Sequence, residues 1–312
     1  MRPKKFDAFH GQKKTVKQLK IIIESSKKRL APIDHMLFHG QPGLGKTTLA
    51  QIVANEVGVN IVITSGQAFS RSGDLASVLA SLSENDILFI DEVHQLSLKC
   101  QELLYTAMED NVIDILIGKG VTAKTIRIDV LPFTLICATT MPNKISKPML
   151  DRFIHNFKLS NYTNSELQTV LEVKSLEFEL KLDDQASRLL IDVSKGTPRI
   201  LINLLKKIRD HFLVSDKNIF FKEDILSILK LNGIDENGLT KIERLILTTI
   251  NDNGNVPIGL KMLAATLNES PNNLENFYEP HLINLGFLTR SHKGRLLTPK
   301  GVDYVRNNVF YE

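Results

Sequence analysis

The stretch GQPGLGKT at residues 40–47 decides how the rest of the chain is interpreted. A short apolar run, Met36–His39, precedes it, and the segment TLAQIVANEVG follows it with apolar residues at helical spacing. The stretch is therefore predicted to turn from a strand into a helix. The spacing G-x-x-x-x-G-K-T, which is typical of a phosphate-binding loop, is met by Gly40, Gly45, Lys46 and Thr47.

Such a loop suits the phosphates of ATP. Its glycines, Gly43 among them, allow several backbone N–H groups to point inward, and the helix N-terminus adds partial positive charge. Lys46 can reach the β- and γ-phosphates, and the Thr47 hydroxyl can ligate Mg²⁺. A glycine-rich turn with an ordinary lysine is the alternative, and the flanking strand and helix argue against it.

The pattern along the chain predicts three parts. Up to about residue 160, apolar strands near 36–39, 60–64, 86–91 and 133–140 alternate with helices, which indicates an α/β domain with a parallel sheet covered on both faces. Helices alone follow, and then three helices and a β-hairpin in the order of a winged helix. The predicted boundaries are 1–162 for the α/β domain, 163–235 for a small all-α domain and 236–312 for a C-terminal winged-helix domain.

Composition limits the class of protein. The 312 residues are 43% hydrophobic and 24% charged, as in a soluble globular protein, and no apolar run approaches the ~18 residues of a membrane span. The N-terminus lacks the apolar core of a signal peptide. Cys100 and Cys137 lie among apolar neighbours, which predicts buried thiols and a cytoplasmic protein. The net charge of +4 does not by itself indicate nucleic-acid binding.

Acids and hydroxyls follow two of the predicted strands. In ILFIDEVH, Asp91 can hold the water shell of Mg²⁺, and Glu92 can polarise the attacking water. Thr139 and Thr140 end the next strand and could place a hydroxyl near the γ-phosphate, although threonines are common at strand ends. His94 is more typical of a packing or hydrogen-bonding residue than of a ligand.

Two arginines could stabilise phosphate charge in the transition state. Arg152 lies in LDRF, and Arg199 begins a helix in GTPR. On sequence alone, a surface ion pair is as good an interpretation of each.

The order of GQPGLGKTT, ILFIDEVH, AMED, DRF, GTPRI and YEPHLINLGFLTR resembles RuvB, the family of bacterial AAA+ motors that drive Holliday-junction branch migration. The match runs from RPKKFDAFHGQ to TPKG, nearly the whole chain. The resemblance implies an AAA+ ATPase domain, a lid domain and a winged helix. It also implies ATP and Mg²⁺ as ligands, Holliday-junction DNA as substrate, a homo-hexamer, and a RuvA-like partner that docks on a hairpin at 113–129. It leaves a junction nuclease open as a further partner.

The resemblance also implies roles for individual residues. Thr140 resembles the first sensor of the γ-phosphate, and Arg199 the second. Arg152 resembles an arginine supplied to the neighbouring subunit's ATP, and Phe9 with His10 falls at the adenine pocket. The implied nucleotide-binding residues are Arg2, Gly43, Gly45, Lys46, Thr47, Thr48, Glu109, Asp110, Asn111, Tyr162 and Arg199.

The chain departs from the family pattern at Phe9 and His10, where Tyr-Ile is usual, and at Asn111, where Phe or Tyr is usual. It also departs at four positions around the catalytic motifs. Leu150 stands where the family commonly has the first arginine of Arg-Asp-Arg-Phe-Gly, and Ile154 stands where it has the glycine. Gln95 and Met141 each replace an arginine. Arg152 must then serve as the only arginine of this motif. The acids and the lysine are intact, so we expect hydrolysis, with an altered rate or coupling.

DNA contact is expected at the C-terminal hairpin. From residue 290 to 306, five basic residues face only Asp303. Arg290 and Arg295 bracket the turn, so its tip is expected to present both to a phosphate backbone, independently of sequence. A solvated basic turn is the alternative.

Two other functions share some of these features. A clamp-loader-like AAA+ protein that remodels a protein partner would share every ATPase motif but lack the C-terminal wing and the docking hairpin. A DNA-binding regulator that only senses nucleotide would not need the intact Glu92.

Overall fold

The structure, a computed structural model, describes residues 2–117, 124–215 and 217–308. The chain divides into two units. The first comprises Met1–Val170 with Thr197–Arg199, and the second comprises Leu171–Gly196 with Ile200–Glu312.

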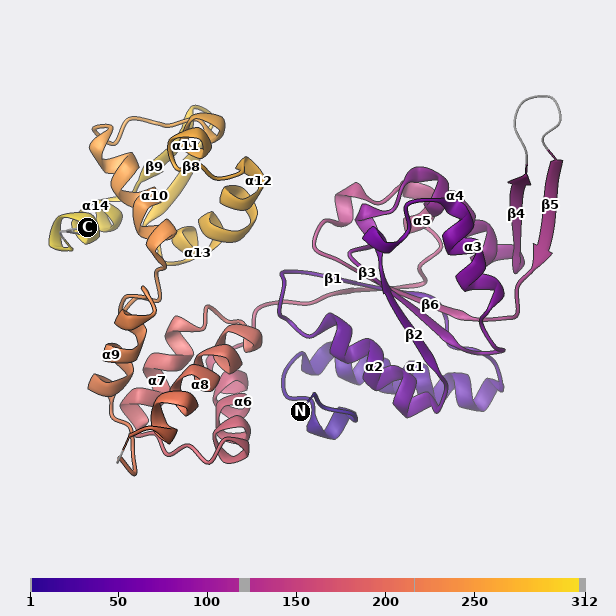
Figure 1. The fold of residues 1–312 in the computed structure, drawn as a ribbon, viewed down its shortest axis with the longest axis horizontal. Coiled ribbons are helices and arrows are strands. Elements are labelled where there is room, and N and C mark those ends of the chain that lie inside the picture. Colours follow the sequence, from indigo (N-terminus) through magenta and orange to yellow (C-terminus); the bar gives the residue numbers. More distant parts are fainter. Residues whose placement is uncertain (1, 118–123, 216, 309–312) are drawn as a thin grey trace. The chain divides into compact units, whose positions relative to one another are not determined.

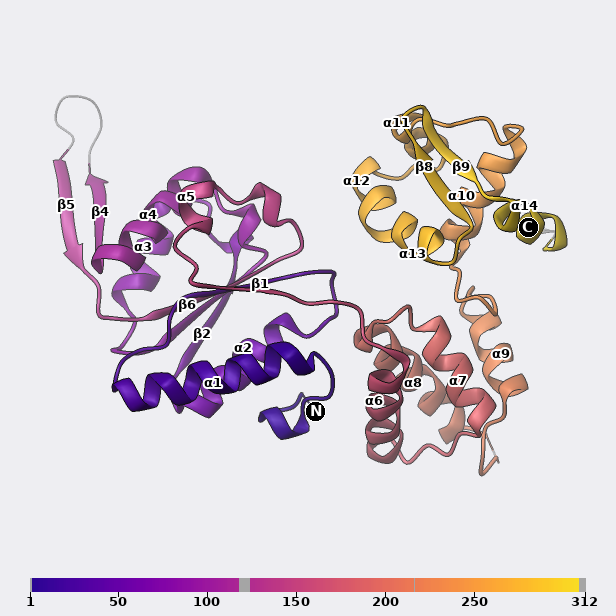
Figure 2. The same ribbon diagram turned by 180° about the vertical axis from the view of Figure 1, so that it is seen from behind.

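A five-stranded parallel sheet with the strand order β2-β3-β6-β1-β7 forms the centre of the first unit. Its strands are β1 (Met36–His39), β2 (Ile61–Ser65), β3 (Ile87–Asp91), β6 (Thr134–Thr139) and β7 (His155–Lys158). One face is covered by α1 (Lys13–Arg29) and α2 (Lys46–Val57), and the other by α3 (Ser72–Ala80), α4 (Leu98–Asp110) and α5 (Lys147–Leu150) (Figures 1 and 2). The predicted parallel sheet between two helical layers is confirmed.

The register of the sheet brings the predicted chemistry to one edge. β1 pairs with β6 so that His39 lies beside Thr139, and β3 pairs with β6 so that Ile90 lies beside Cys137. The segments that leave the carboxyl ends of β1, β3 and β6 therefore begin side by side, which is where ligands bind in open α/β sheets. Short 3-10 helices occur at η1 (Phe6–Ala8), η2 (Gly66–Ala68), η3 (Val93–Gln95) and η5 (Pro142–Lys144).

The core of this unit lies between the sheet and the layer of α3, α4 and α5. Leu88 and Leu135 from the sheet pack there with Leu104 from α4, and all three are fully buried. Cys100 and Cys137 belong to the same cluster as buried free thiols, as the sequence predicts. Burial raises the pKa of the Cys137 thiol, so it stays protonated.

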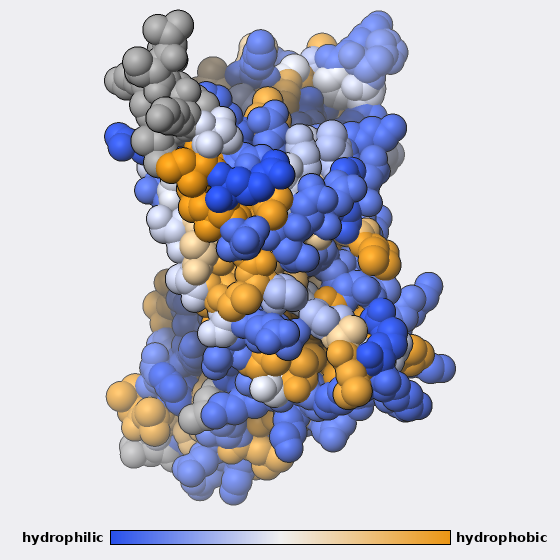
Figure 3. Space-filling model, turned by 90° about the vertical axis from the view of Figure 1, so that its right-hand side faces the viewer, coloured by the Kyte–Doolittle hydropathy of each residue, from blue (hydrophilic) through white to orange (hydrophobic). Residues whose placement is uncertain are grey.

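An antiparallel hairpin extends from the first unit. It consists of β4 (Val112–Ile117) and β5 (Lys124–Asp129), and the turn at 118–123 predicted between them lies outside the described residues. One face of the hairpin is apolar. Ile113 is fully buried at its base, whereas Ile126, further along, is 46% exposed. In the space-filling view of this side, apolar residues lie around hydrophilic ones in the region of the hairpin (Figure 3).

The second unit is helical up to residue 231. Its helices are α6 (Asn164–Glu177), which the first unit shares, α7 (Asp184–Val193), α8 (Pro198–Leu213) and α9 (Lys222–Leu231). The predicted capping box opens α6, since Thr163 N–H donates to Glu166 Oε2 (3.0 Å) and Glu166 N–H donates to Thr163 Oγ1 (3.3 Å). In the part of the chain described, no helix is both long and apolar enough to span a bilayer.

A winged helix completes the second unit. It contains α10 (Lys241–Asp252), α11 (Leu260–Thr266), α12 (Pro271–Asn273), the π-helical turn η6 (Leu274–Tyr278), α13 (Glu279–Asn284), β8 (Leu288–Ser291), β9 (Gly294–Leu297) and α14 (Pro299–Asn307). The predicted third helix is thus divided. Pro280 explains the division, because a proline inside a helix lacks the N–H of the regular ladder and its ring clashes with the preceding turn.

The linker between the helical part and the winged helix is held by hydrogen bonds. The carboxylate of Asp235 accepts from the N–H groups of Asn237 (3.0 Å) and Leu239 (2.7 Å). It also accepts from the Tyr304 hydroxyl on α14. The predicted linker at 232–238 is therefore an ordered turn rather than a loose connection.

Candidate active site

The phosphate-binding loop has the geometry that its sequence predicts. Gly43 (φ 85°) and Gly45 (φ 102°) adopt left-handed conformations, and Gly45 caps α2 at its N-terminus. The Lys46 side chain is buried, and its ammonium donates to the carbonyls of Gly40 (2.8 Å) and Gln41 (3.0 Å). Thr47 and Thr48 follow in the first turn of α2.

The charge state of Lys46 depends on two opposing effects. Burial lowers the pKa of its ammonium, whereas the carboxylates of Glu92 and Asp91 act in the opposite direction. The acids at the end of β3 therefore help to keep the lysine charged.

A hydroxyl and a carboxylate that suit Mg²⁺ are in contact. The Thr47 Oγ1–H donates to Asp91 Oδ2 at 3.1 Å, although the two residues are far apart in the sequence. Mg²⁺ takes few protein oxygens and keeps several waters. This pair is therefore a sufficient donor set for the ion beside a nucleotide.

Glu92 is held in a constrained position. Its backbone is left-handed (φ 48°, ψ 48°), which is uncommon outside glycine and is often found at functional sites. Its Oε2 accepts from the backbone N–H (3.2 Å) and the hydroxyl (3.0 Å) of Thr140. The Thr140 hydroxyl, expected near the γ-phosphate, thus donates a hydrogen bond to the Glu92 carboxylate, which is expected to polarise water.

His94 completes this group as a hydrogen-bonding residue. Its Nδ1 lies 2.9 Å from Thr139 Oγ1 and 3.2 Å from Glu92 Oε2. Burial lowers the pKa of the imidazole, and the Glu92 carboxylate opposes that shift only in part. His94 is therefore neutral at pH 7, and it links the ends of two strands.

Two aromatic rings lie over the start of α2. A Cβ at Gly45 would lie 3.1 Å from Cε2 of Phe9 and 3.6 Å from the hydroxyl of Tyr162. The Tyr162 hydroxyl donates to the carbonyl of Leu44 at 3.3 Å, and burial raises its pKa, so it stays a neutral donor. Both residues implied by the resemblance are thus at the loop, whereas Arg2 is exposed.

Arg199 also lies at the loop. It is in the first turn of α8, and its Cβ would be 2.9 Å from a Cβ placed on Gly43. The neighbouring Thr197 approaches the same point to 2.8 Å. Thr197 and Arg199, which both belong to the first unit, therefore lie against the phosphate-binding loop.

The residues implied to serve a neighbouring subunit form a second group. Arg152 makes an ion pair with Glu109 at the end of α4, and its guanidinium lies 5.6 Å from the ring centroid of Tyr105. Asp110 ends the same helix, and Asn111 caps it in a left-handed conformation (φ 54°). The alternative interpretation of Arg152, an ion pair, is thus present in this chain without excluding a role at a neighbour's ATP.

Two departures from the family pattern flank Arg152. Leu150 packs against the core of the first unit, and Ile154 is 69% exposed. Leu150, at the position where the family commonly has its first arginine, therefore packs against the core instead.

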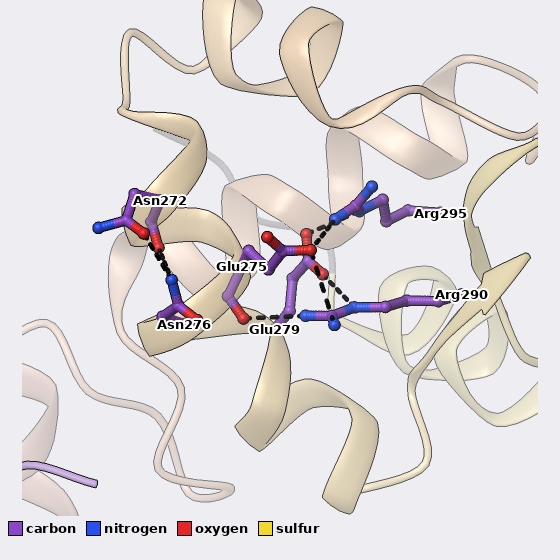
Figure 4. Close-up of polar contacts among 6 residues, drawn as sticks. All are labelled: Asn272, Glu275, Asn276, Glu279, Arg290 and Arg295. Atoms are coloured by element: carbon purple, nitrogen blue, oxygen red, sulfur yellow. Dashed lines mark hydrogen bonds and ion pairs between the residues drawn. The ribbon is translucent and has the colours of Figure 1, made fainter. Parts of the chain in front are cut away.

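The expected presentation of the wing arginines needs correction. Arg290 and Arg295 are opposite each other in the β8–β9 register, but their guanidiniums pair with glutamates of the winged helix. Both donate to the buried carboxylate of Glu279 through Nε, at 2.6 and 2.9 Å, and both lie near Glu275 (Figure 4). The buried carboxylate between them gives both like charges a counter-ion. Whether they contact DNA stays a prediction.

Sequence reasoning missed the acidic partners. Glu275 and Glu279 are four residues apart, as are residues on one face of a helix, and this spacing was the available signal. It also missed an ion pair in the second unit, where the Lys195 ammonium lies 2.7 Å from both carboxylate oxygens of Glu243.

Family models match this chain in three consecutive segments. The Holliday junction DNA helicase RuvB P-loop domain matches residues 1–159. The RuvB AAA lid domain matches residues 162–235, and the RuvB C-terminal winged helix domain matches residues 236–306. The three-part fold class is thereby confirmed, and the boundaries of 1–162, 163–235 and 236–312 stay predictions.

Named relatives and solved structures agree with these matches. The Holliday junction branch migration complex subunit RuvB of Kosmotoga olearia is 43% identical over 301 residues, covering 96% of this chain and 88% of that protein. The corresponding subunit of Campylobacter hominis is 42% identical over 303 residues, covering 97% and 89%. The Thermotoga maritima RuvB Holliday junction branch migration motor has a TM-score of 0.87 at 38% identity, with 99% of each chain covered. The chain therefore belongs to the RuvB family.

Proposed function

We propose that this chain is an ATP-driven DNA translocase subunit that moves Holliday junctions during recombination and DNA repair. The observation that carries the proposal is the joining of two parts in one chain. One part places Lys46, Asp91 and Glu92 around a phosphate-binding loop, and the other is a winged helix. ATP turnover and DNA contact on the same chain are what a DNA motor requires.

Each group near the loop has a role in hydrolysis. Lys46 and the N-terminus of α2 bind the phosphates, and Glu92 orients and polarises the attacking water. Thr140 holds the Glu92 carboxylate by a hydrogen bond from its hydroxyl. A change in the position of that carboxylate would therefore move Thr140 as well. Arg199, packed against Gly43, links the γ-phosphate to α8.

Mg²⁺ fits the contact between Thr47 and Asp91. The hydroxyl and the carboxylate would hold the ion and its waters beside the β- and γ-phosphates. When bound, the ion neutralises part of the phosphate charge.

The assembly is proposed to be a homo-hexamer. In a ring, Arg152 would act on the ATP of the neighbouring subunit, together with Glu109, Asp110 and Asn111 at the end of α4. Its ion pair with Glu109 would then have to open or shift when the neighbour's nucleotide arrives. We propose a cytoplasmic location, and a junction nuclease remains open as a further partner.

A RuvA-like junction-binding protein is proposed to dock on the β4–β5 hairpin. The apolar face becomes exposed away from the base of the hairpin, and Ile126 offers the clearest contact there. Ile115 is less suitable for a test, because it also packs against the core of the first unit. Ile126→Asp is expected to weaken docking and leave basal ATP turnover unchanged. Thr125→Asp, which places the same charge on the opposite face of β5, is the matched control.

The decisive experiment is branch migration of a synthetic four-way junction with and without the junction-binding partner. We expect ATP-dependent migration, stimulated by the partner, and ATP turnover stimulated by junction DNA. Turnover without migration, stimulated instead by a protein, would favour the clamp-loader-like alternative. DNA binding without turnover would favour a regulator that senses nucleotide.

A further inference from the structure

The winged helix contains an ionic cluster of two glutamates and two arginines. Glu275 lies in the π-helical turn and Glu279 begins α13, while Arg290 and Arg295 face each other across the wing (Figure 4). The two positive and two negative charges cancel. A DNA phosphate approaching these arginines therefore meets a cluster without net charge.

The two glutamates are bound with unequal strength. Glu279 is fully buried, and each of its carboxylate oxygens accepts from one arginine Nε, at 2.6 Å from Arg290 and 2.9 Å from Arg295. The Glu275 side chain is 45% exposed, and its Oε1 lies 3.3 Å from Arg295 Nη2 and 3.9 Å from Arg290 Nη1. Glu279 is thus a fixed counter-ion, whereas Glu275 is weakly held and reaches solvent.

The π-helical turn fixes Arg290 to the backbone. The N–H of Glu279 donates to the carbonyl of Leu274, five residues back, instead of to the carbonyl of Glu275. The next residue, Pro280, has no N–H to offer. The Glu275 carbonyl accepts from Arg290 Nη2 at 2.8 Å instead. Arg290 is thereby held by Nε and Nη2, while its side chain stays 40% exposed.

We propose that the Glu275 carboxylate occupies the position of a DNA phosphate at Arg290 and is exchanged for it when DNA binds. The inference rests on the proposed DNA role of the wing. Arg290 Nη1 lies 3.9 Å from Glu275 Oε1, which is an ion pair without a hydrogen bond. A phosphate carries more negative charge than a carboxylate and accepts hydrogen bonds from a guanidinium, so it can replace the carboxylate there. Arg295, only 12% exposed, acts with Glu279 as a support that keeps Arg290 in place.

The exchange would keep the affinity of this contact for DNA low. A translocase must release each phosphate contact before it makes the next one. A carboxylate that returns to Arg290 when the phosphate leaves lowers the affinity of the contact and speeds its release. Glu275 is therefore a positioning residue that tunes DNA binding rather than a residue that contacts DNA.

The test is DNA binding by the full chain carrying Glu275→Gln, measured by fluorescence anisotropy with labelled duplex over a series of salt concentrations. Removing a unit charge ~6 Å from a phosphate is expected to tighten binding about threefold in a water-like dielectric. The dependence of log affinity on log salt is expected to steepen by up to ~0.9, because no carboxylate is set free to take up a cation when Arg290 binds its phosphate. Glu275→Met, which removes the charge and the acceptor, is expected to tighten binding similarly.

Two further variants separate the possible outcomes. Asp252→Asn removes the same charge from an exposed site on α10, outside the cluster, and is expected to tighten binding less. Arg290→Ala tests the wing itself. If Arg290→Ala leaves affinity unchanged, the wing is not the DNA contact, and the proposed DNA role fails. If Arg290→Ala weakens binding but both Glu275 variants bind as the unmodified chain does, the exchange is refuted and the DNA role stands.

Discussion

The ion pair between Lys195 and Glu243 permits a quantitative prediction. Lys195 lies in the turn between α7 and α8 with a left-handed backbone (φ 58°), and its ammonium is 2.7 Å from both carboxylate oxygens. The Glu243 side chain is only 2% exposed. Its Oε2 also accepts from the N–H and the hydroxyl of Thr240, each at 2.8 Å. Lys195→Met would leave a buried carboxylate with the Thr240 donors but without its nearest positive charge.

The expected loss follows from these contacts. Removing one partner of a buried ion pair costs about 3–5 kcal/mol, and the remaining Thr240 donors favour the lower end, about 3 kcal/mol. At roughly 3 °C per kcal/mol, the second unit should melt about 10 °C lower. Lys195→Met combined with Glu243→Gln removes both charges of this pair and should recover most of the lost stability.

Differential scanning calorimetry of the full chain measures the effect, because it separates the transitions of different units. Lys206→Met makes the same substitution at an exposed position on α8 and should leave the melting temperature nearly unchanged. A wild-type melting temperature for Lys195→Met would refute the reasoning, and so would a double variant no more stable than the single one.

Three other predictions follow from contacts described above. Glu92→Gln should bind ATP yet turn it over very slowly in a steady-state ATPase assay, because the amide cannot polarise water; normal turnover would assign that role elsewhere. Arg152→Ala should depress hydrolysis by ~10³–10⁵. Mixing it with Lys46→Ala should restore some activity if neighbouring subunits share a site, whereas no rescue in mixed rings would mean that Arg152 acts in its own subunit or not at all. Burial, aided by the Lys195 ammonium, lowers the pKa of His281 from 6.5 to about 4. The protein should therefore be up to about 3 kcal/mol more stable above pH 6.5, and this stability should be lost as the pH falls toward 4. Unfolding midpoints measured across this range should show the loss, and His281→Leu should flatten the profile.

The first unit was predictable because its signals are local. The phosphate-binding loop lies within eight residues, and each strand reads as an apolar run ending in the residues that matter, such as Asp91 after ILFI. Parallel pairing then brings the strand ends together without further information. The contact between Thr47 and Asp91 follows from that geometry.

The winged helix was less predictable because its contacts are not local. The sequence shows the charges of Arg290 and Arg295, but their counter-ion Glu279 belongs to a different element, and its burial depends on how that element packs. The same holds for Lys195 and Glu243, which are 48 residues apart. Pro280, in contrast, was a visible signal that the third helix would be divided.

The hydrogen bonds of Asp235 have a mechanical consequence. Because the Asp235 carboxylate accepts hydrogen bonds from Asn237, Leu239 and Tyr304, the linker between α9 and α10 is stiff. A movement that begins at α8 can then pass along the chain with little loss to bending of the linker. A glycine-rich insertion at this point would bend easily and absorb the motion instead of passing it on. Such a chain would still hydrolyse ATP and hold DNA, but its turnover would be futile.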